Sequence, residues 1–371
     1  MQYAIQTLWF ERRRYMAGML AVAFSAVLMA VQGGVLVGLV ATVSAPVDVS
    51  EAQIWIAAKH TPSADNGGPI SNRFRNRLLM IPDVAQTDEY VQEFTRWWNP
   101  RAGTVLVILC GQNLSDRGLG PLAQLSPELM VALSEPGAVA IDRTDKEKLG
   151  VEKLGDVAEI HGYKVRVVGF LNNMPSMTGC YVFCSIPTAK KMLFYKDYEA
   201  TYILARATSE DKVAPIMNAL REIPDIDVLS KNEFSAQSRW YWILKTKSGL
   251  AVGFTALLGL LVGAVVTSQT LYSATASMLR ELAVLKSLGV PGWRMNLFVL
   301  QQSLVIGLVG LAIGLPLAVA FQWMGILIGT QIDIPMSLLA ATAAIVLGVA
   351  LASGLLALRS LFNVDPAELL R

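Results

Sequence analysis

Four long stretches without a charged residue constrain this chain more than any other feature of its sequence. They are Tyr15–Val47, Ser248–Leu279, Met295–Ile332 and Ile334–Leu358, and the shortest contains 25 residues. A helix needs about 20 apolar residues to cross roughly 30 Å of hydrocarbon. The pattern therefore predicts four transmembrane helices and excludes a wholly soluble enzyme. It also excludes a porin-like barrel, whose strands alternate in polarity and are only about 10 residues long.

The charged residues gather in one segment of the chain. Of the 60 Asp, Glu, Lys and Arg residues, 47 lie in the 200 positions Asp48–Lys247, which is close to the charge content of about 25% in soluble domains. We therefore expect one or two folded domains between the first and second spans. The net charge of +2 gives no reason to expect a nucleic-acid partner.

Short basic segments predict the orientation in the membrane. Arg12–Arg14 precede the first span, Arg280, Lys286 and Arg294 lie between the second and third, and Arg359 follows the fourth. Short loops rich in Lys and Arg stay in the cytoplasm, so both termini are expected inside and the large domain outside. The first apolar stretch exceeds the 7–15 residues or so of a signal-peptide core, which favours an uncleaved span.

These arguments give a fold class and a set of boundaries. We expect an α-helical membrane protein with four transmembrane helices and a mixed α/β extracytoplasmic domain inserted between helices 1 and 2. The segments are a cytoplasmic N-terminal segment 1–15, transmembrane helix 1 at 16–43, an extracytoplasmic (periplasmic) α/β domain at 44–240, a stalk with transmembrane helix 2 at 241–274, a cytoplasmic coupling loop at 275–295, transmembrane helix 3 at 296–328, transmembrane helix 4 at 336–358 and a cytoplasmic tail at 359–371.

Alternation and spacing predict several elements within the outer domain. Apolar residues at helical spacing favour a helix over Ser209–Ile223, and Gly162 at a turn favours a hairpin over His161–Leu171. Strands are expected at Ala52–Ala58, Thr104–Cys110, Thr201–Arg206 and Asp227–Leu229. Because no proline interrupts 232–288, one continuous helix is favoured there over a helix, a loop and a span, with Trp240, Tyr241 and Trp242 at the outer interface.

Several kinds of chemistry are not encoded in this sequence. It has no P-loop, no G-x-S-x-G nucleophile motif and no H-E-x-x-H zinc motif. His60 and His161 lack metal-site spacing, which favours two unrelated surface residues. No Asp, Glu, Lys or Arg lies within a span, which argues against a proton- or ion-coupled transporter. Cys110, Cys180 and Cys184 are expected outside the cytoplasm, where either a disulfide from Cys110 or buried free thiols are open to them.

Glycines recur within the spans, where small residues let helices approach closely. They predict close packing within the chain or between two copies. These residues are Gly33, Gly34, Gly38, Gly259, Gly263, Gly307, Gly310 and Gly314.

The loop between the second and third spans is the strongest candidate for a contact with a partner. Leu282, Leu285 and Leu288 follow a helical spacing, Gly289 is suited to end that helix, and Pro291 to open the next. The result is a compact helix–turn–helix in which Val290 and Trp293 lie near the tip. A positively charged topology anchor is the simpler interpretation of the same loop. The candidate coupling residues are Arg280, Glu281, Leu285, Lys286, Leu288, Gly289, Val290, Trp293 and Arg294.

At this point the chain resembles a known family. Its order of spans and its loop pattern Arg280-Glu281-x-Ala283-x-Leu285-Lys286-x-Leu288-Gly289 are similar to those of ABC-transporter permeases of the MacB/FtsX/LolC-E type (type VII). The C-terminal Asp365–Arg371 resembles that family's Pro-x-x-x-Leu-Arg ending, and Ala52–Ile56 resembles the start of the outer domain in the DevC branch.

The resemblance implies a function and a set of partners. It implies a permease subunit of an ABC exporter that works by mechanotransmission, driven by a separate ATPase that binds the ATP and Mg²⁺, with no cofactor in this chain and no enzymatic activity of its own. It further implies a second copy of the chain, a periplasmic adaptor (membrane fusion protein), an outer-membrane duct and contact with membrane lipid in the bacterial inner membrane. The cargo would be a lipid, glycolipid, peptide or drug.

Three alternatives remain open from the sequence. The first is a permease that extracts lipoproteins, similar to LolC/LolE. The second is an FtsX-like activator that binds a cell-wall hydrolase, although the outer domain of such proteins is usually smaller than 200 residues. The third is a membrane-bound enzyme with its site in the outer domain, which the lack of a nucleophile or metal motif disfavours.

Overall fold

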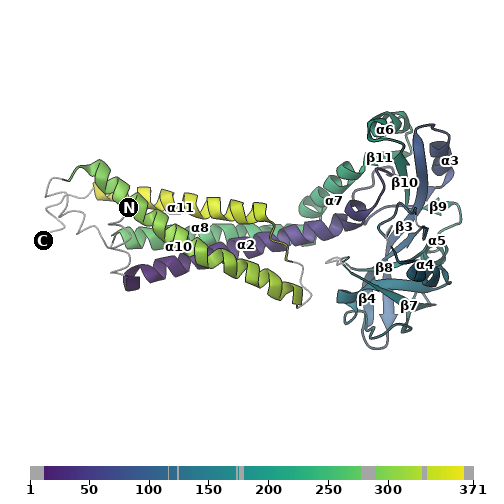
Figure 1. The fold of residues 1–371 in the computed structure, drawn as a ribbon, viewed down its shortest axis with the longest axis horizontal. Coiled ribbons are helices and arrows are strands. Elements are labelled where there is room, and N and C mark those ends of the chain that lie inside the picture. The colour runs from purple at the N-terminus through teal and green to yellow at the C-terminus, as the bar shows by residue number, and fades with distance from the viewer. Residues whose placement is uncertain are drawn as a thin grey trace. The chain divides into compact units, whose positions relative to one another are not determined.

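The structure is a computed structural model, and it describes residues 12–115, 117–122, 125–172, 174, 179–276, 290–327 and 332–362. The chain divides into two compact units (Figure 1). One comprises residues 1–38 and 251–371, and the other comprises residues 39–250. We call the first the membrane unit and the second the outer domain. The expected fold class is confirmed, because four apolar helices accompany a mixed α/β domain that follows the first of them.

Four helices are long and apolar enough to cross a membrane. They are α2 (Arg12–Val49), α8 (Lys247–Ala276), α10 (Gly292–Leu327) and α11 (Met336–Phe362). Many large apolar side chains on them remain exposed, including Phe254, Leu257 and Leu261 of α8. Exposed apolar surface is unfavourable in water by about 25 cal/mol per Å², and it suits hydrocarbon or a second protein surface instead.

Small residues set the contacts within the membrane unit. A Cβ atom at Gly310 would lie 2.6 Å from the Val22 side chain, and one at Gly263 would lie 2.6 Å from Met29. The backbones of α10 and α8 therefore approach α2 more closely than any larger residue would allow, as the sequence predicted. The buried core of this unit consists mainly of Val22, Ala26, Met29, Val299, Ile306, Leu311, Val346 and Ala350.

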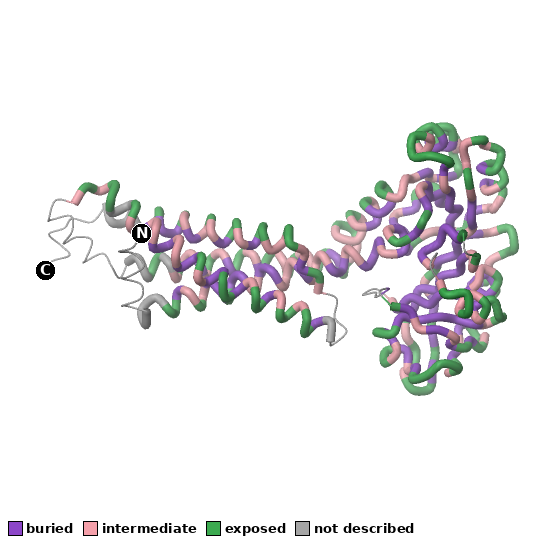
Figure 2. Tube along the Cα trace, viewed as in Figure 1, coloured by how far each residue is buried: buried purple, intermediate pink, exposed green. Residues whose placement is uncertain are grey.

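The outer domain is built on one nine-stranded sheet, in the order β11-β1-β10-β3-β4-β8-β5-β7-β6. Its strands are β1 (Ile54–Ala58), β3 (Val84–Asn99), β4 (Gly103–Gln112), β5 (Ala138–Asp142), β6 (Val157–Ile160), β7 (Tyr163–Leu171), β8 (Cys180–Ser185), β10 (Tyr202–Ala207) and β11 (Ile226–Ser230). A separate ribbon pairs β2 (Ile70–Ser71) with β9 (Glu199–Ala200). Figure 2 shows that buried residues concentrate along these strands.

Helices complete the outer domain. They are α3 (Arg73–Leu79), α4 (Pro127–Ser134), α5 (Ile186–Leu193), α6 (Val213–Arg221) and α7 (Lys231–Lys245), with short 3₁₀ turns η1 (Arg143–Asp145) and η2 (Glu210–Lys212). The succession β1-α3-β3 and β10-α6-β11, with strand order β11-β1-β10-β3, is the split βαβ arrangement of ferredoxin-like folds. The other five strands of the nine-stranded sheet are inserted between β3 and β10.

Strand β3 belongs to both halves of the sheet. Its first residues pair with β10, and Val91–Asn99 pair with β4. The inserted strands then return to its end, because β6 pairs with β3 through Trp97 and Trp98. Six strands thus close on themselves, which leaves no free edge among them. Trp97 is fully buried at this closure, and its indole N–H donates to the Leu149 carbonyl at 3.1 Å.

Most expected elements of the outer domain are confirmed, and one is wrong. The strands, the hairpin turning at His161 and Gly162, and the helix α6 lie where the sequence placed them. The continuous helix from residue 232 is interrupted, because Thr246 has extended backbone angles (φ −91°, ψ 146°) between α7 and α8. The three cysteines are free and buried, which resolves the alternatives in favour of thiols.

Candidate functional site

The C-terminal part of α2 and helix α7, which together we call the stalk, are bound to each other within the outer domain. Arg239 of α7 forms an ion pair with Asp48 of α2 at 2.6 Å and donates from Nε to the Ser44 hydroxyl at 2.8 Å. Ser44 in turn donates to Asp48 at 2.7 Å. Charge-assisted bonds of this length are roughly twice as strong as neutral ones. This three-residue cluster, which we call the stalk clamp, holds the two helices in one register.

Helix α7 is also bound to the body of the outer domain. Gln237 donates to the Thr61 carbonyl at 2.7 Å, and the Ser238 hydroxyl accepts from the Ala64 amide at 2.9 Å. Phe234 is fully buried against Trp55 and Tyr202, with ring centroids 5.6 and 5.5 Å away. Offset and edge-on aromatic pairs are favourable beyond their buried area. A displacement of α7 must therefore move the sheet that carries these residues.

Trp242 ties the last turn of α7 to a buried carboxylate. Its indole N–H lies 3.0 and 2.9 Å from the two oxygens of Asp65, whose Oδ1 also accepts from Ser63 at 2.6 Å. Asp65 is only 4% exposed. Burial raises the pKa of this carboxyl above its usual 3.8, because desolvation of the charged form outweighs the stabilising bonds from Ser63 and Trp242.

A single threonine joins α7 to α8. The Thr246 hydroxyl donates to the Trp242 carbonyl at 2.7 Å and accepts from the Gly249 amide at 2.9 Å. It therefore caps the end of one helix and the start of the next. The glycine is required by close approach, since a Cβ atom at Gly249 would overlap the Trp242 carbonyl oxygen.

The structure describes only part of the predicted coupling loop. Arg280, Glu281, Leu285, Lys286, Leu288 and Gly289 lie outside the described residues. Val290 packs partly against the core of the membrane unit. Trp293, in the first turn of α10, is 63% exposed, and the Arg294 guanidinium lies 5.2 Å from its ring centroid. Among the described candidates, Trp293 thus presents the largest free apolar surface.

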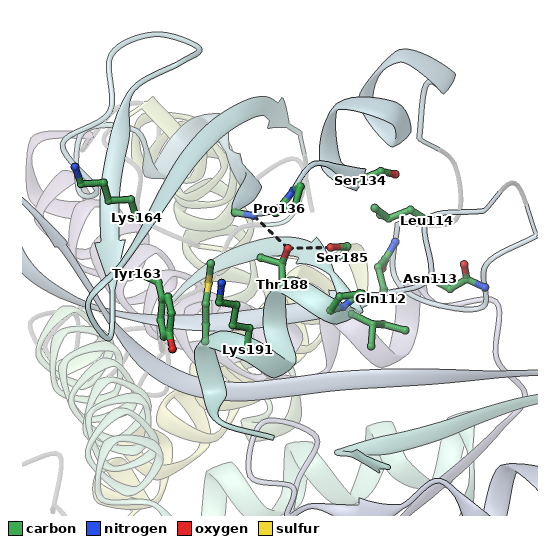
Figure 3. A pocket seen from close by; sticks show the side chains of 14 residues that line it. Gln112, Asn113, Leu114, Ser134, Pro136, Tyr163, Lys164, Ser185, Thr188 and Lys191 are labelled. Atoms are coloured by element: carbon green, nitrogen blue, oxygen red, sulfur yellow. Dashed lines mark hydrogen bonds between the residues drawn. The ribbon is translucent and has the colours of Figure 1, made fainter. Parts of the chain in front are cut away.

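A cleft of about 500 Å³ opens in the inserted part of the outer domain (Figure 3). Its polar groups are largely engaged within the protein. Thr188 accepts from the Gly137 amide at 3.3 Å, and the Ser185 hydroxyl donates to it at 3.0 Å. Lys191 lies 5.2 Å from the Tyr163 ring centroid. The lining contains no carboxylate, histidine or cysteine.

The described residues contain no group of three or more His, Cys, Asp or Glu side chains arranged to hold a metal. The cysteines are equally unsuited to chemistry. Burial raises the pKa of Cys110 and that of Cys180 to about 12, and that of Cys184 well above its usual value. Since the thiolate is the reactive form, these side chains act as packing groups.

Sequence reasoning missed the stalk clamp and the Trp242–Asp65 contact. Asp48 and Arg239 are separated by 191 positions, and Asp65 and Trp242 by 177. No local pattern relates such positions. The one available signal was the isolated negative charge of Asp48 at the end of an apolar helix. A half-buried carboxylate is favourable only when a cation or hydrogen-bond donor pairs with it.

Two family models match most of the chain. The MacB-like periplasmic core domain matches residues 17–223, more than half of the sequence, and the FtsX-like permease C-terminal domain matches residues 253–366. The chain belongs to the MacB/FtsX-type ABC permeases.

Two solved structures are similar to about half of this chain. One is the extracellular domain of the noncanonic ABC-type transporter YknZ from Gram-positive bacteria, with 13% identity, 48% of this chain and 98% of that chain covered, and a TM-score of 0.33. The other is the periplasmic region of MacB from Actinobacillus actinomycetemcomitans, with 12% identity, coverage of 50% and 91%, and a TM-score of 0.34. A comparison with curated proteins found no match.

Family membership defines the setting of the molecule. The permease is a multi-pass inner-membrane protein whose large domain lies in the periplasm. Permeases of this kind are not themselves enzymes, and the family implies an ABC ATPase as a partner subunit.

Proposed function

We propose that this permease is the membrane subunit of an exporter that works by mechanotransmission, with hydrolysis of ATP in a separate subunit moving the periplasmic domain. The observation that carries the proposal is the set of bonds fixing α2 and α7 to the outer domain: the stalk clamp, the Gln237 and Ser238 bonds, and the Trp242–Asp65 contact. Through these bonds, a movement of α2 or α7 would be passed on to the outer domain.

The spans support the same proposal. They carry no charged residue in the four long apolar stretches, whereas a substrate pathway through the membrane usually contains ionisable or strongly polar groups. Cargo would then be handled at the periplasmic surface, by a homodimer that works with a periplasmic adaptor and an outer-membrane duct. We propose that the cargo is a lipid, glycolipid, peptide or drug.

The ATPase contact is proposed at the start of α10. Trp293 is largely exposed there and braced by Arg294, and buried aromatic residues commonly dominate the free energy of an interface. Trp293→Ala should therefore weaken binding of the cognate ATPase by about 2 kcal/mol, roughly a thirtyfold increase in Kd.

The same helix supplies a matched control. Trp323 lies in α10 as well and is 69% exposed, so Trp323→Ala removes a similar area of ring far along the helix. ATPase capture by purified permease, in detergent, should fall for the first variant and remain normal for the second. Equal capture by both variants and the unmodified chain would refute the coupling role of Trp293. ATP turnover by the pure permease alone would refute the proposal that a separate subunit hydrolyses ATP.

A further inference from the structure

A second cleft, of about 510 Å³, lies beside the C-terminal part of α2 and the joint between α7 and α8. Its wall is largely apolar, with Leu39 from α2, Phe94 from β3, Leu106 from β4 and Trp242 from α7. Strand register pairs Phe94 with Ile108 and Arg96 with Leu106, which places Phe94 and Leu106 on one face of the sheet. Leu106 is 50% exposed, so this wall leaves apolar surface without a protein partner among the described residues.

Residues of two candidate spans line the cleft, and counting along them puts it near the membrane surface. Leu39 belongs to the span Met16–Val49, and about 20 residues counted from Met16 end within a few positions of it. Ser248, at the rim of the cleft, is the second residue of the span that starts at Lys247. Trp240 and Trp242 precede that span by a few residues, and tryptophan is enriched at the membrane interface.

The charges at the rim favour an anionic headgroup. Lys245 and Lys247 flank the lining residue Thr246, and both are exposed. Neither forms an ion pair with a described residue. A cation near the membrane surface attracts anionic lipid by about 1 kcal/mol. An apolar wall and a cationic rim at this depth match the two ends of a phospholipid.

We propose that a phospholipid of the outer leaflet binds here, with one acyl chain against Phe94 and Leu106 and its phosphate beside Lys245 and Lys247. The bound lipid would fill the space between the stalk and the sheet, next to the Trp242–Asp65 contact. This inference requires insertion in a membrane but does not depend on ATP-driven transport, so either proposal can fail while the other holds.

Photolabelling of the full chain tests the site. The permease is reconstituted in vesicles of phosphatidylethanolamine and phosphatidylglycerol that contain a trace of phosphatidylglycerol with a diazirine near the end of an acyl chain. Tryptic cleavage after Arg77, Arg96, Arg101 and Arg117 separates Phe94, Trp98 and Leu106 into different peptides. We expect label on the peptides 78–96 and 102–117, in addition to the spans. Label confined to the spans would overturn the proposal.

A pair of variants distinguishes a built site from general contact with the bilayer surface. Trp98 is 47% exposed on the same face of the strands but does not line the cleft. Leu106→Asp should reduce labelling of the peptide 78–96 severalfold, whereas Trp98→Asp should leave it unchanged, with unaltered circular dichroism in both. Equal label on the peptide 97–101, or full labelling in Leu106→Asp, would also overturn the proposal.

Discussion

Several polar or ionisable side chains of this permease are buried in the outer domain. Asp65 is the clearest case, because its carboxylate is almost fully buried and yet the described residues bind it only through neutral donors. A buried charge without a cation is unfavourable, so its raised pKa is the expected response. The three buried thiols are different, because they are free, carry no charge and pack within the core.

The raised pKa of Asp65 predicts a specific dependence of stability on pH. Because the folded state holds this proton more tightly than the unfolded chain, the carboxyl favours folding most at low pH. That contribution is lost as the pH rises from 3.8 through the folded-state pKa. Asp65→Asn keeps an oxygen acceptor for Trp242 and removes the charge, so it should raise the melting temperature at neutral pH. The difference from the unmodified permease should shrink on acidification.

An exposed aspartate provides the control for this measurement. A bond from Ser209 lowers the pKa of Asp211, so Asp211→Asn should show no gain in stability at neutral pH. Thermal unfolding followed by circular dichroism at several pH values gives both comparisons. A melting-temperature difference for Asp65→Asn that is independent of pH would contradict the prediction.

Among the elements, the pair α7 and α8 connects the outer domain to the second span. Helix α7 begins with a capping box, in which Ser230 accepts from the Glu233 amide and Glu233 accepts from the Ser230 amide. It ends at Thr246, whose hydroxyl serves both helices. Both termini of α7 are thus fixed by side chains, and the joint to α8 depends on one hydroxyl group.

Replacing that hydroxyl should loosen the joint. Thr246→Val keeps the shape of the side chain but loses the bonds to Trp242 and Gly249, and loss of a helix cap is unfavourable by about 1 kcal/mol. Amide hydrogen exchange at the start of α8 should accelerate roughly fivefold. Thr255→Val is the matched control, since the Thr255 hydroxyl bonds only back to Val252 within α8. Exchange at Lys247–Leu250 that is equal in both variants would contradict a capping role for Thr246.

The whole molecule is organised as two units with separate hydrophobic cores. The outer domain has its own clusters around Trp97, Trp55 and Phe74, while the membrane unit is centred on Val22 and Val346. Separate cores allow each unit to keep its internal packing while their relation changes. This arrangement suits the proposed transmission of force through the stalk.

The orientation of the molecule is predicted by its basic segments. A phosphatase reporter that is active only outside the cytoplasm should be active when fused after Gly118 and inactive when fused after Ser287. Replacing Arg280, Lys286 and Arg294 with glutamine should weaken this asymmetry, because the positive charges retain their loop inside. Activity of the Ser287 fusion in the unmodified chain would contradict the assignment of both termini to the cytoplasm.

The sequence by itself determined the spans, the position of the outer domain and many of its elements. Those features depend on local composition, alternation and helical spacing. The strand β3 was missed because charged and polar residues such as Asp88, Glu89 and Arg96 interrupt its apolar pattern, although pairing on both sides makes it central to the sheet.

Only the tertiary structure decided the closure of β6 onto β3, the stalk clamp and the break at Thr246. The first two join residues far apart in the chain, such as Asp48 and Arg239, and such contacts are fixed by the balance of packing and loop entropy over the whole domain. The break has a local cause that propensity alone does not reveal. No residue there forbids a helix, and the two bonds of the Thr246 hydroxyl stabilise an extended backbone instead.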